Sequence, residues 1–181
     1  MRVLIDACVL YPTVLRRLVL GLASTGAFTP LWSARILEEW ARAAARGGPA
    51  SEAAARGEIA AARAGFPAAE VVPAPDVEAA LSLPDPNDRH VLAAAIAGRA
   101  DELLTLNVSD FPIRALGAHG ILRRHPDEFL LEAFHADPGT MGALVGKVHG
   151  QAVADGADLT RRALLKKALL PRLGKAVETK W

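Results

Sequence analysis

Cysteine is nearly absent from this sequence, which excludes two kinds of site. Cys8 is the only cysteine among 181 residues, so neither an intramolecular disulfide nor a cysteine-based zinc knuckle is expected. A reducing compartment fits such a chain, and we expect a cytoplasmic protein. The first residues agree with this, because the carboxylate of Asp6 comes too early for a secretory signal peptide.

Long apolar runs and a strong net charge are also missing. No uninterrupted apolar stretch approaches the ~18–20 residues that span a bilayer, so no membrane partner is expected. The net charge of +1 neither demands nor excludes a nucleic-acid partner. The chain is nevertheless 51% hydrophobic and 23% charged, which is enough for a sizeable core.

The first two thirds of the chain alternate short apolar segments with helical patterns. Extended segments are predicted at residues 3–5, 28–32, 71–72, 103–106 and 120–122. Helices are predicted at residues 12–24, 34–46, 51–64, 76–81 and 90–97. This alternation predicts a three-layer α/β/α fold with a central parallel sheet and right-handed crossovers.

The last third has a different pattern. After residue 125 we expect helices only, at residues 127–135, 138–153 and 159–177, the last with a break at Pro171. No low-complexity linker separates the two parts. We therefore predict an α/β domain at residues 1–125 and a helical C-terminal extension at residues 126–181.

Two acids follow predicted strands. Asp6 ends the first strand, and Asp110 comes shortly after the strand at 103–106. Ligands of parallel α/β folds bind beyond the C-terminal ends of the strands, so both acids are expected at the functional edge of the sheet. Either acid alone has a simpler interpretation, because Asp6 is also suited to capping a turn and Asp110 to a turn before Phe-Pro.

Two more acids come from predicted helices. On the helix at 34–46, Glu39 flanks the apolar face, whereas Glu38 points closer to the opposite side. Asp88 lies in the first turn of a helix beside the ligand edge. Asp85 precedes Pro86 and has the pattern of a helix N-cap, which accounts for it without a metal role.

An acidic cluster of this kind indicates a particular chemistry. Carboxylates that share a pocket repel one another and need cations to stay ionised together. Oxygen ligands favour Mg²⁺ or Mn²⁺. One such ion activates water and a second neutralises a leaving oxygen, which suits hydrolysis of a phosphodiester. The number of ions stays open.

The residues of this cluster lie in stretches that resemble the PIN-domain ribonucleases, which include the VapC-type toxins. The stretches are VLIDACVLYP, LWSARILEEWARA, LPDPNDRHVLAAAIAGRAD and LLTLNVSDFP, within residues 1–125. The tail from HPDEFLLEAF onward resembles the helical extension of one branch of the family. The resemblance implies a metal-dependent endoribonuclease that forms a homodimer, is inhibited by a small antitoxin protein and acts on RNA, with transfer RNA as one candidate.

The resemblance also assigns residues. It implies that Asp6, Glu39, Asp88 and Asp110 are the catalytic and metal-binding carboxylates. Many family members have an acid where Asn107 stands, so either Asp110 substitutes for that acid or Asn107 itself binds or orients a water. Asp85, Thr105 and Asn107 are candidates for supporting or substrate contacts.

The last predicted helix is rich in basic residues. Arg162 and Lys166 are i,i+4 neighbours and place positive charge on one face. The face is either an ordinary solvated surface or a surface that follows the phosphates of RNA.

Two other classes of function compete with a nuclease. A phosphotransfer or receiver-like domain also places acids at strand ends, but Asp6-Ala7-Cys8 lacks the paired acids that such proteins need. A Gly-rich phosphate loop is missing as well, which argues against a nucleotide kinase. A catalytically silent binding or scaffold protein on the same fold is the second alternative, and the intact acidic set argues against it.

Overall fold

The structure is a computed structural model, and it describes residues 1–180. Within this range, strands form at β1 (Arg2–Ile5), β2 (Thr29–Ser33), β3 (Glu70–Val71), β4 (Glu102–Leu104) and β5 (Leu122–Arg124). They make one parallel sheet in the order β3-β2-β1-β4-β5. β1 is central, and its last three residues, Val3, Leu4 and Ile5, are fully buried, as expected of a strand covered on both faces.

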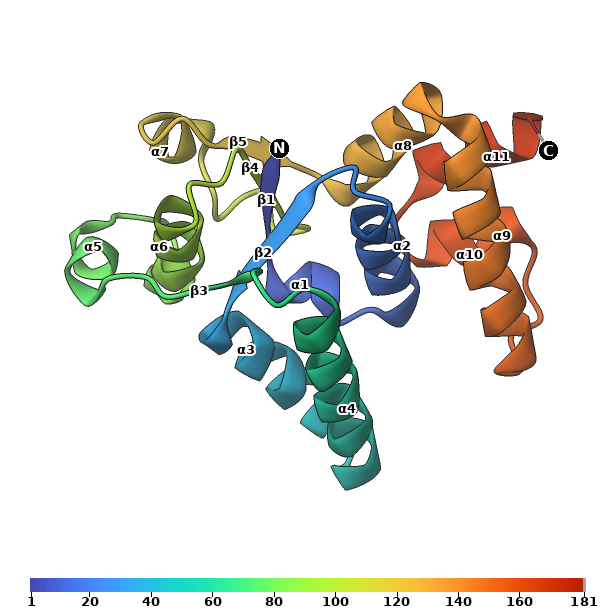
Figure 1. The fold of residues 1–181 in the computed structure, drawn as a ribbon, viewed down its shortest axis with the longest axis horizontal. Coiled ribbons are helices and arrows are strands. Elements are labelled where there is room, and N and C mark those ends of the chain that lie inside the picture. The colour runs from blue at the N-terminus through green and yellow to red at the C-terminus, as the bar shows by residue number, and fades with distance from the viewer. Residues whose placement is uncertain (181) are drawn as a thin grey trace.

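Helices flank this sheet, and more of them follow it. The first group is α1 (Ala7–Leu10), α2 (Thr13–Ser24), α3 (Ala34–Ala45), α4 (Pro49–Gly65), α5 (Pro75–Ala80), α6 (Arg89–Ala97) and α7 (Ile113–Gly117), with a 3-10 turn η1 at Pro86–Asp88. The second group is α8 (Pro126–Ala136), α9 (Pro138–Ala154), α10 (Arg161–Lys167) and α11 (Pro171–Lys180). Figure 1 shows α2 and α6 on opposite sides of the sheet. The predicted α/β/α fold with C-terminal helices is confirmed.

Local sequence signals explain where several helices begin and end. The Ser33 hydroxyl accepts a hydrogen bond from the amide of Ile36, 3.2 Å away, and so caps α3 as predicted. α3 ends before the Gly47-Gly48-Pro49 sequence. Gly48 has φ 98°, a left-handed conformation that favours glycine, and it turns the chain into α4.

The C-terminal helices share the core of the sheet domain. α9 packs on α2, and Phe129 of α8 meets Phe28 edge to face, with ring centroids 5.2 Å apart. One continuous cluster of buried apolar residues includes Val3 of β1 and Leu173 of α11. The division at residue 125 stays a prediction about domains, but the core crosses it.

Asp127 joins α11 to the rest of the molecule. Its two carboxylate oxygens accept hydrogen bonds from the amides of Arg172 and Leu173, each 3.0 Å away. These are the first-turn amides of α11, so a residue of α8 caps a helix that begins 44 positions later.

Within residues 1–180, no helix combines the length and the apolar character that are needed to cross a bilayer.

Three elements differ from the sequence-based expectation. The one-turn helix α1 was not predicted. The last strand lies at Leu122–Arg124 instead of 120–122, because Gly120 has φ 71° and belongs to the preceding turn. The helix expected from Asp85 onward is a 3-10 turn followed by α6, and the final helix is divided into α10 and α11 before Pro171, near the break that was predicted.

Candidate active site

Asp6 and Thr105 lie side by side because their strands are neighbours. β1 and β4 pair with Ile5 opposite Leu104, so the next residue of each chain leaves the sheet at the same edge. The Thr105 hydroxyl donates a hydrogen bond to Oδ2 of Asp6 at 2.7 Å. Asp6 precedes α1, but its side chain makes no capping bond there. The carboxylate is therefore held towards the edge of the sheet and is not used as a helix cap.

Cys8 is a second donor to the same oxygen. Its thiol lies 3.0 Å from Oδ2 of Asp6 and accepts a hydrogen bond from the amide of Leu106 at 3.3 Å. Burial and the negative charge of Asp6 raise the pKa of the Cys8 thiol to about 12. Cys8 is thus a neutral hydrogen-bond donor, and a role as nucleophile or thiolate ligand does not fit it.

Asp88 has the most perturbed carboxylate of this edge. It is the N-cap of α6 but makes no capping hydrogen bond, and its Oδ2 is buried with no partner among residues 1–180. Burial, together with the charges of Asp6, Asp85 and Asp110, raises the pKa of Asp88 to about 6. The three aspartates must therefore lie within electrostatic reach of Asp88, where a cation would relieve their repulsion.

Asp85 is used by the backbone. Its Oδ1 accepts a hydrogen bond from the amide of Asn87 at 2.8 Å, which makes it the N-cap of the 3-10 turn. The sequence pattern predicted this capping role. Asp85 still contributes negative charge to Asp88, so it shapes the field of the site while its own oxygen is occupied.

Asn107 connects Asp110 to Thr105. Its side-chain amide donates to Oδ2 of Asp110, and its backbone amide donates to the Thr105 hydroxyl at 3.0 Å. A continuous chain of hydrogen bonds therefore runs from Asp110 through Asn107 and Thr105 to Asp6. In this arrangement Asp110 is the carboxylate at the edge, and Asn107 is the residue that positions it.

Glu39 and Glu38 have separate environments. Oε1 of Glu39 lies 2.8 Å from Nε2 of His90 and 3.6 Å from Nε of Arg35. Glu38 forms ion pairs with Arg56 of α4 and Arg42 of α3. Helix phase thus separates the two as expected, with Glu39 facing α6. Glu39 contacts His90, which follows Asp88 by two residues. It is not among the charges that raise the pKa of Asp88.

The carboxylates lie at the same edge of the sheet, but they do not surround a common position for a metal ion. Within residues 1–180, no group of three or more His, Cys, Asp or Glu side chains is placed to hold a metal ion. Mg²⁺ is commonly held by one or two carboxylates and keeps several waters. The unpartnered oxygen of Asp88 next to Asp6 and Asp110 therefore fits a hydrated divalent cation, for which a full protein cage is unnecessary.

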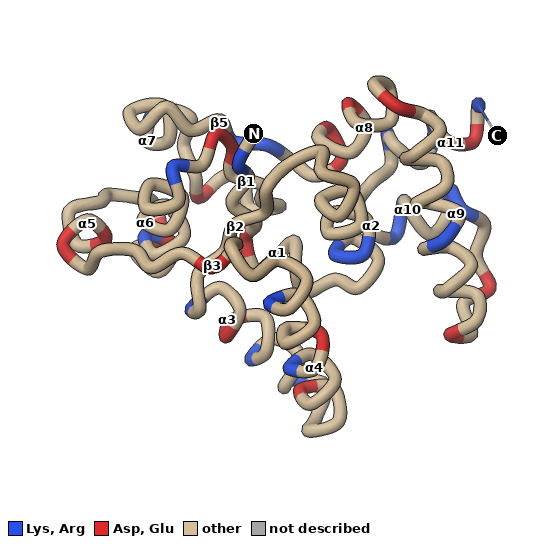
Figure 2. The backbone as a smooth tube through the Cα atoms, in the orientation of Figure 1, with Lys and Arg blue, Asp and Glu red and all other residues tan. Residues whose placement is uncertain are grey.

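The basic residues proposed from the sequence lie on the C-terminal helices. Arg162 of α10 forms an ion pair with Glu178 of α11 at 2.5 Å, and Lys166 is exposed. Lys and Arg lie on α2 and above all on α10, with a single lysine on α9, whereas α5 has acids instead (Figure 2). The chain thus has an acidic edge beside α6 and a more basic side beyond α2.

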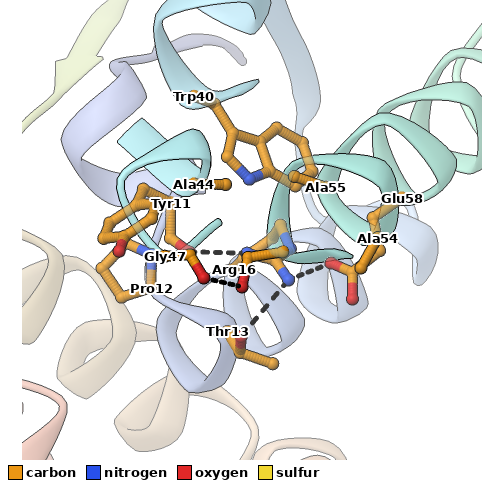
Figure 3. Close-up of a pocket in the computed structure, with 11 residues that line it drawn as sticks. Tyr11, Pro12, Thr13, Arg16, Trp40, Ala44, Gly47, Ala54, Ala55 and Glu58 are labelled. Carbon is orange, nitrogen blue, oxygen red and sulfur yellow. Dashed lines mark hydrogen bonds and ion pairs between the residues drawn. The ribbon is translucent and has the colours of Figure 1, made fainter. Parts of the chain in front are cut away.

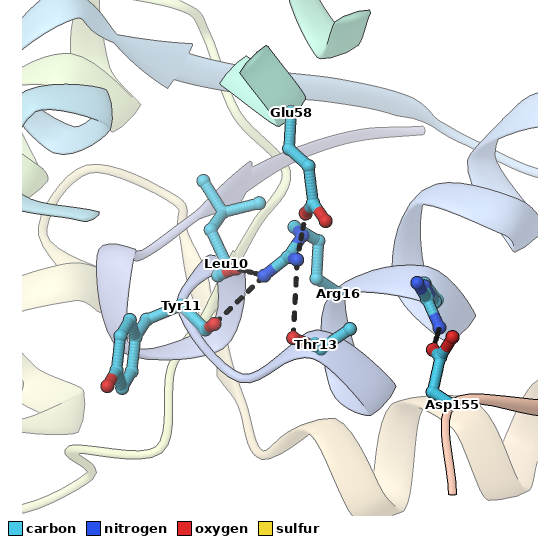
Figure 4. A network of polar contacts seen from close by, with 7 residues as sticks. Leu10, Tyr11, Thr13, Arg16, Glu58 and Asp155 are labelled. Atoms are coloured by element: carbon cyan, nitrogen blue, oxygen red, sulfur yellow. Dashed lines mark hydrogen bonds and ion pairs between the residues drawn. The ribbon is translucent and has the colours of Figure 1, made fainter. Parts of the chain in front are cut away.

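One buried charged residue was not singled out from the sequence. Arg16 is buried in α2, and its guanidinium donates to the carbonyls of Leu10 and Tyr11 at 2.6 and 2.8 Å (Figure 4). It also pairs with Glu58 of α4 and lies over the Trp40 ring. Its neighbour Arg17 shares its charge, and no feature of the sequence alone separates a buried arginine from an exposed one at these positions.

Comparisons with known proteins agree on the first part of the chain. A family model described as a PIN domain matches residues 2–109. The matched segment includes Asp6, Glu39 and Asp88 and stops one residue before Asp110. A putative ribonuclease VapC50 of Mycobacterium tuberculosis (strain ATCC 25618 / H37Rv) is 42% identical over 62 residues, which are 34% of this chain and 37% of that protein. The alignment thus spans little more than a third of that relative. No solved structure matches.

Proposed function

This chain belongs to the PIN-domain family, and from this membership we propose that it is a metal-dependent endoribonuclease, the toxin of a toxin–antitoxin pair. The observation that best supports the proposal is the buried, unpartnered Oδ2 of Asp88 beside two other aspartates. Such an oxygen is costly unless a cation or donor reaches it. The similarity to a putative ribonuclease agrees with RNA as the substrate.

A hydrated Mg²⁺ or Mn²⁺ would be held at Asp6, Asp88, Asp110 and Glu39, partly through its own waters, because no three of these side chains are placed to bind one ion together. When bound, such an ion supplies Lewis-acid activation of water and neutralises charge on the leaving oxygen. Thr105 and Cys8 fix one oxygen of Asp6 through their hydrogen bonds, so that Oδ1 stays free to act. Asn107 fixes Asp110 in the same way.

The protein's own groups account for water orientation. Glu39 or Asp110 accepts a proton from the attacking water and orients its oxygen towards phosphorus. The oxygen attacks phosphorus, the bond to the leaving oxygen breaks, and that oxygen takes up a proton from solvent. The products are two RNA fragments, and no covalent bond to the enzyme forms at any stage.

We also propose the partners that the family membership suggests. These are an RNA substrate, with transfer RNA as a candidate, a small antitoxin protein, and a second copy of the chain in a homodimer. We place the activity in the cytoplasm. The sequence offers Arg162 and Lys166 as contacts with the RNA backbone. This stays a competing prediction that we do not adopt, because Arg162 is already paired with Glu178.

A cleavage assay tests this function directly. Total RNA is incubated with the full chain and Mn²⁺ or Mg²⁺, and the wild type is compared with Asp6→Asn. We expect cleavage by the wild type that EDTA abolishes, and a loss of at least about a hundredfold in Asp6→Asn. Glu38→Gln is the matched control, because Glu38 is in surface ion pairs. Equal cleavage by the wild type and Asp6→Asn would contradict the proposal.

A further inference from the structure

The chain turns sharply just after α1, and this corner separates two hollows. Tyr11 ends α1 one helical turn after Asp6, and its side chain is 45% exposed. The first hollow, of about 400 Å³, lies between this corner and the α3–α4 arm (Figure 3). The second, of about 410 Å³, lies between α2 and the C-terminal helices. Pro12 and Thr13 line both hollows, whereas Tyr11 lines the first alone, so the corner is a ridge between them that follows Asp6 by five residues along the chain.

The first hollow is poorly suited to holding a phosphate. Its cation, Arg16, is buried and already donates to the carbonyls of Leu10 and Tyr11 and to Glu58 (Figure 4). Glu58 adds negative charge to the same wall. An anion that entered this hollow would have to break an existing buried network.

The second hollow has cations that are not tied into a buried network. Arg17 of α2 and Lys167 of α10 line it, together with one acid, Asp155. Arg17 lies 3.4 Å from Asp155, whose side chain is 64% exposed, and an exposed pair of this kind contributes little energy. The pair can therefore yield to a stronger anion.

The backbone adds to the positive field of this hollow. α2 is twelve residues long and begins at Thr13, with Pro12 as an N-cap that has no capping side chain. Its first amides have no acceptor within the helix, and its dipole is positive at this end. Thr13 and Val14 line the second hollow, so the N-terminal end of α2 borders it together with Arg17 and Lys167.

We propose that single-stranded RNA runs from the aspartate edge across Tyr11 and into the hollow between α2 and α10. A base stacks on the exposed Tyr11 ring, and the following phosphates contact Arg17, Lys167 and the first turn of α2. This pairing of an aromatic platform with a cationic groove is how proteins bind single strands without reading their sequence. The inference rests on the proposed function and assigns to the C-terminal extension the role of one wall of the substrate groove.

The path selects different basic residues from those singled out by the sequence. Leu164, Lys167 and Ala168 line the hollow. At 100° per residue, Lys166 points about 160° away from Leu164, to the other side of α10. Lys166 and Lys167 are both exposed and adjacent, so they form a matched pair of test and control positions.

RNA binding is measured by fluorescence anisotropy with a fluorescein-labelled twelve-nucleotide oligouridine, without divalent ions and in the Asp6→Asn background, which prevents cleavage. We expect Arg17→Gln with Lys167→Gln to weaken binding about tenfold. The dependence of log affinity on log salt should become shallower by about 1.4, since each neutralised phosphate of a single strand contributes about 0.7. Arg162→Gln with Lys166→Gln should change affinity less than about twofold.

Tyr11 gives an independent arm of the same experiment. Tyr11→Ala should weaken oligouridine binding about tenfold with no change of salt dependence, and Tyr11→Phe should restore it, because stacking needs the ring and not the hydroxyl. Equal melting temperatures of all variants verify that they are folded.

Two results would overturn the proposed path. One is equal affinity and equal salt dependence for the α2–α10 pair of variants and the Arg162–Lys166 pair. The other is wild-type affinity in Tyr11→Ala. Neither result bears on the proposed nuclease activity, which the cleavage of total RNA by wild type and Asp6→Asn decides separately. If the Arg17 and Lys167 variants keep their affinity for oligouridine but lose the binding of a protein ligand, the hollow belongs to a protein partner instead.

Discussion

Nε2 of His90 lies 2.8 Å from Oε1 of Glu39, and this contact links the helix that begins after Asp88 to the helix that contains Glu39. His90 is 2% exposed, so its ring is fixed by packing. Glu39 is also drawn by Arg35 at 3.6 Å, towards the surface. The orientation of Glu39 is therefore a balance between one buried and one exposed partner.

The first prediction concerns His90 as a positioning residue. His90→Leu should weaken Mn²⁺ binding by about three- to tenfold, because Glu39 then turns to Arg35, whereas His90→Gln keeps a donor and should restore most of the affinity. Free Mn²⁺ is measured by electron paramagnetic resonance. If His90 matters only for packing, the two variants will bind Mn²⁺ equally, and Glu39→Gln will add its full effect to His90→Leu instead of overlapping with it.

The second prediction concerns the hydrogen bond from Thr105 to Asp6. Thr105 is fully buried, so Thr105→Val keeps the shape but removes the donor to Asp6 and the acceptor for Asn107. We expect a loss of about 2 kcal/mol in the free energy of unfolding, measured by urea denaturation. Mn²⁺ affinity should fall as well. Thr105→Ser is the control, since it retains the hydroxyl and loses about 0.8 kcal/mol for one methyl group.

The third prediction is a pH dependence of stability in metal-free protein. The pKa of Asp88 is raised from 3.8 to about 6, so the folded chain binds this proton more tightly than the unfolded chain. Its contribution to stability is thus greatest below about pH 4 and declines as pH rises to about 6. In EDTA, the wild type should lose more stability than Asp88→Asn between these values. Glu102, whose pKa burial also raises, is present in both proteins and cancels in the comparison. Parallel profiles would contradict this environment for Asp88.

The same shift predicts how metal affects the melting temperature. Mn²⁺ binds the ionised carboxylate, so it should stabilise the wild type more at pH 7 than at pH 5. Differential scanning fluorimetry with and without Mn²⁺ measures the difference. Asp88→Asn should show little stabilisation at either pH, and an undiminished effect of Mn²⁺ in this variant would place the ion elsewhere.

The fifth prediction separates the two partners of the buried Arg16 network. Arg16→Ala leaves the carbonyls of Leu10 and Tyr11 without donors and opens space under Trp40. We expect a loss of about 3 kcal/mol in urea denaturation. Glu58→Gln should cost less than about 1 kcal/mol, because the Glu58 side chain is 43% exposed and Arg16 keeps its carbonyl partners. Equal losses would mean that the ion pair, and not the carbonyl contacts, stabilises the corner.

Local patterns predicted much of the fold and the separate environments of neighbouring acids. The apolar strand 3–5 and the N-caps Ser33 and Asp85 follow from short-range rules, and helix phase alone distinguished Glu39 from Glu38. The predictions failed where tertiary contacts compensate for an unfavourable local sequence. Glu102 is a buried charge inside β4, and its pairing with Arg124 of β5 at 3.1 Å is a contact between distant residues. A search of the sequence for apolar runs leaves both Glu102 and Arg124 outside the predicted strands.

The details of the site depend on the same kind of distant contact. Asp6 and Thr105 meet through strand register, and Glu39 and His90 meet through the packing of α3 against α6. A sequence shows which acids reach the edge of the sheet, but not which neighbour occupies each oxygen. The one-turn helix α1 was missed because its four residues are too few for a helical periodicity to be recognised.

The chemical reactivity of Cys8 depends on its contacts at the aspartate edge. With a pKa of about 12, only ~10⁻⁴ of the thiol is ionised at pH 8, so alkylating reagents and mild oxidants find almost no thiolate to attack. The reactivity of the thiol should rise when its contacts with Asp6, Thr105 and Leu106 are broken. Because this is the chain's only cysteine, we expect the rate at which iodoacetamide labels the native protein to report on the loss of these contacts, without a probe having to be introduced.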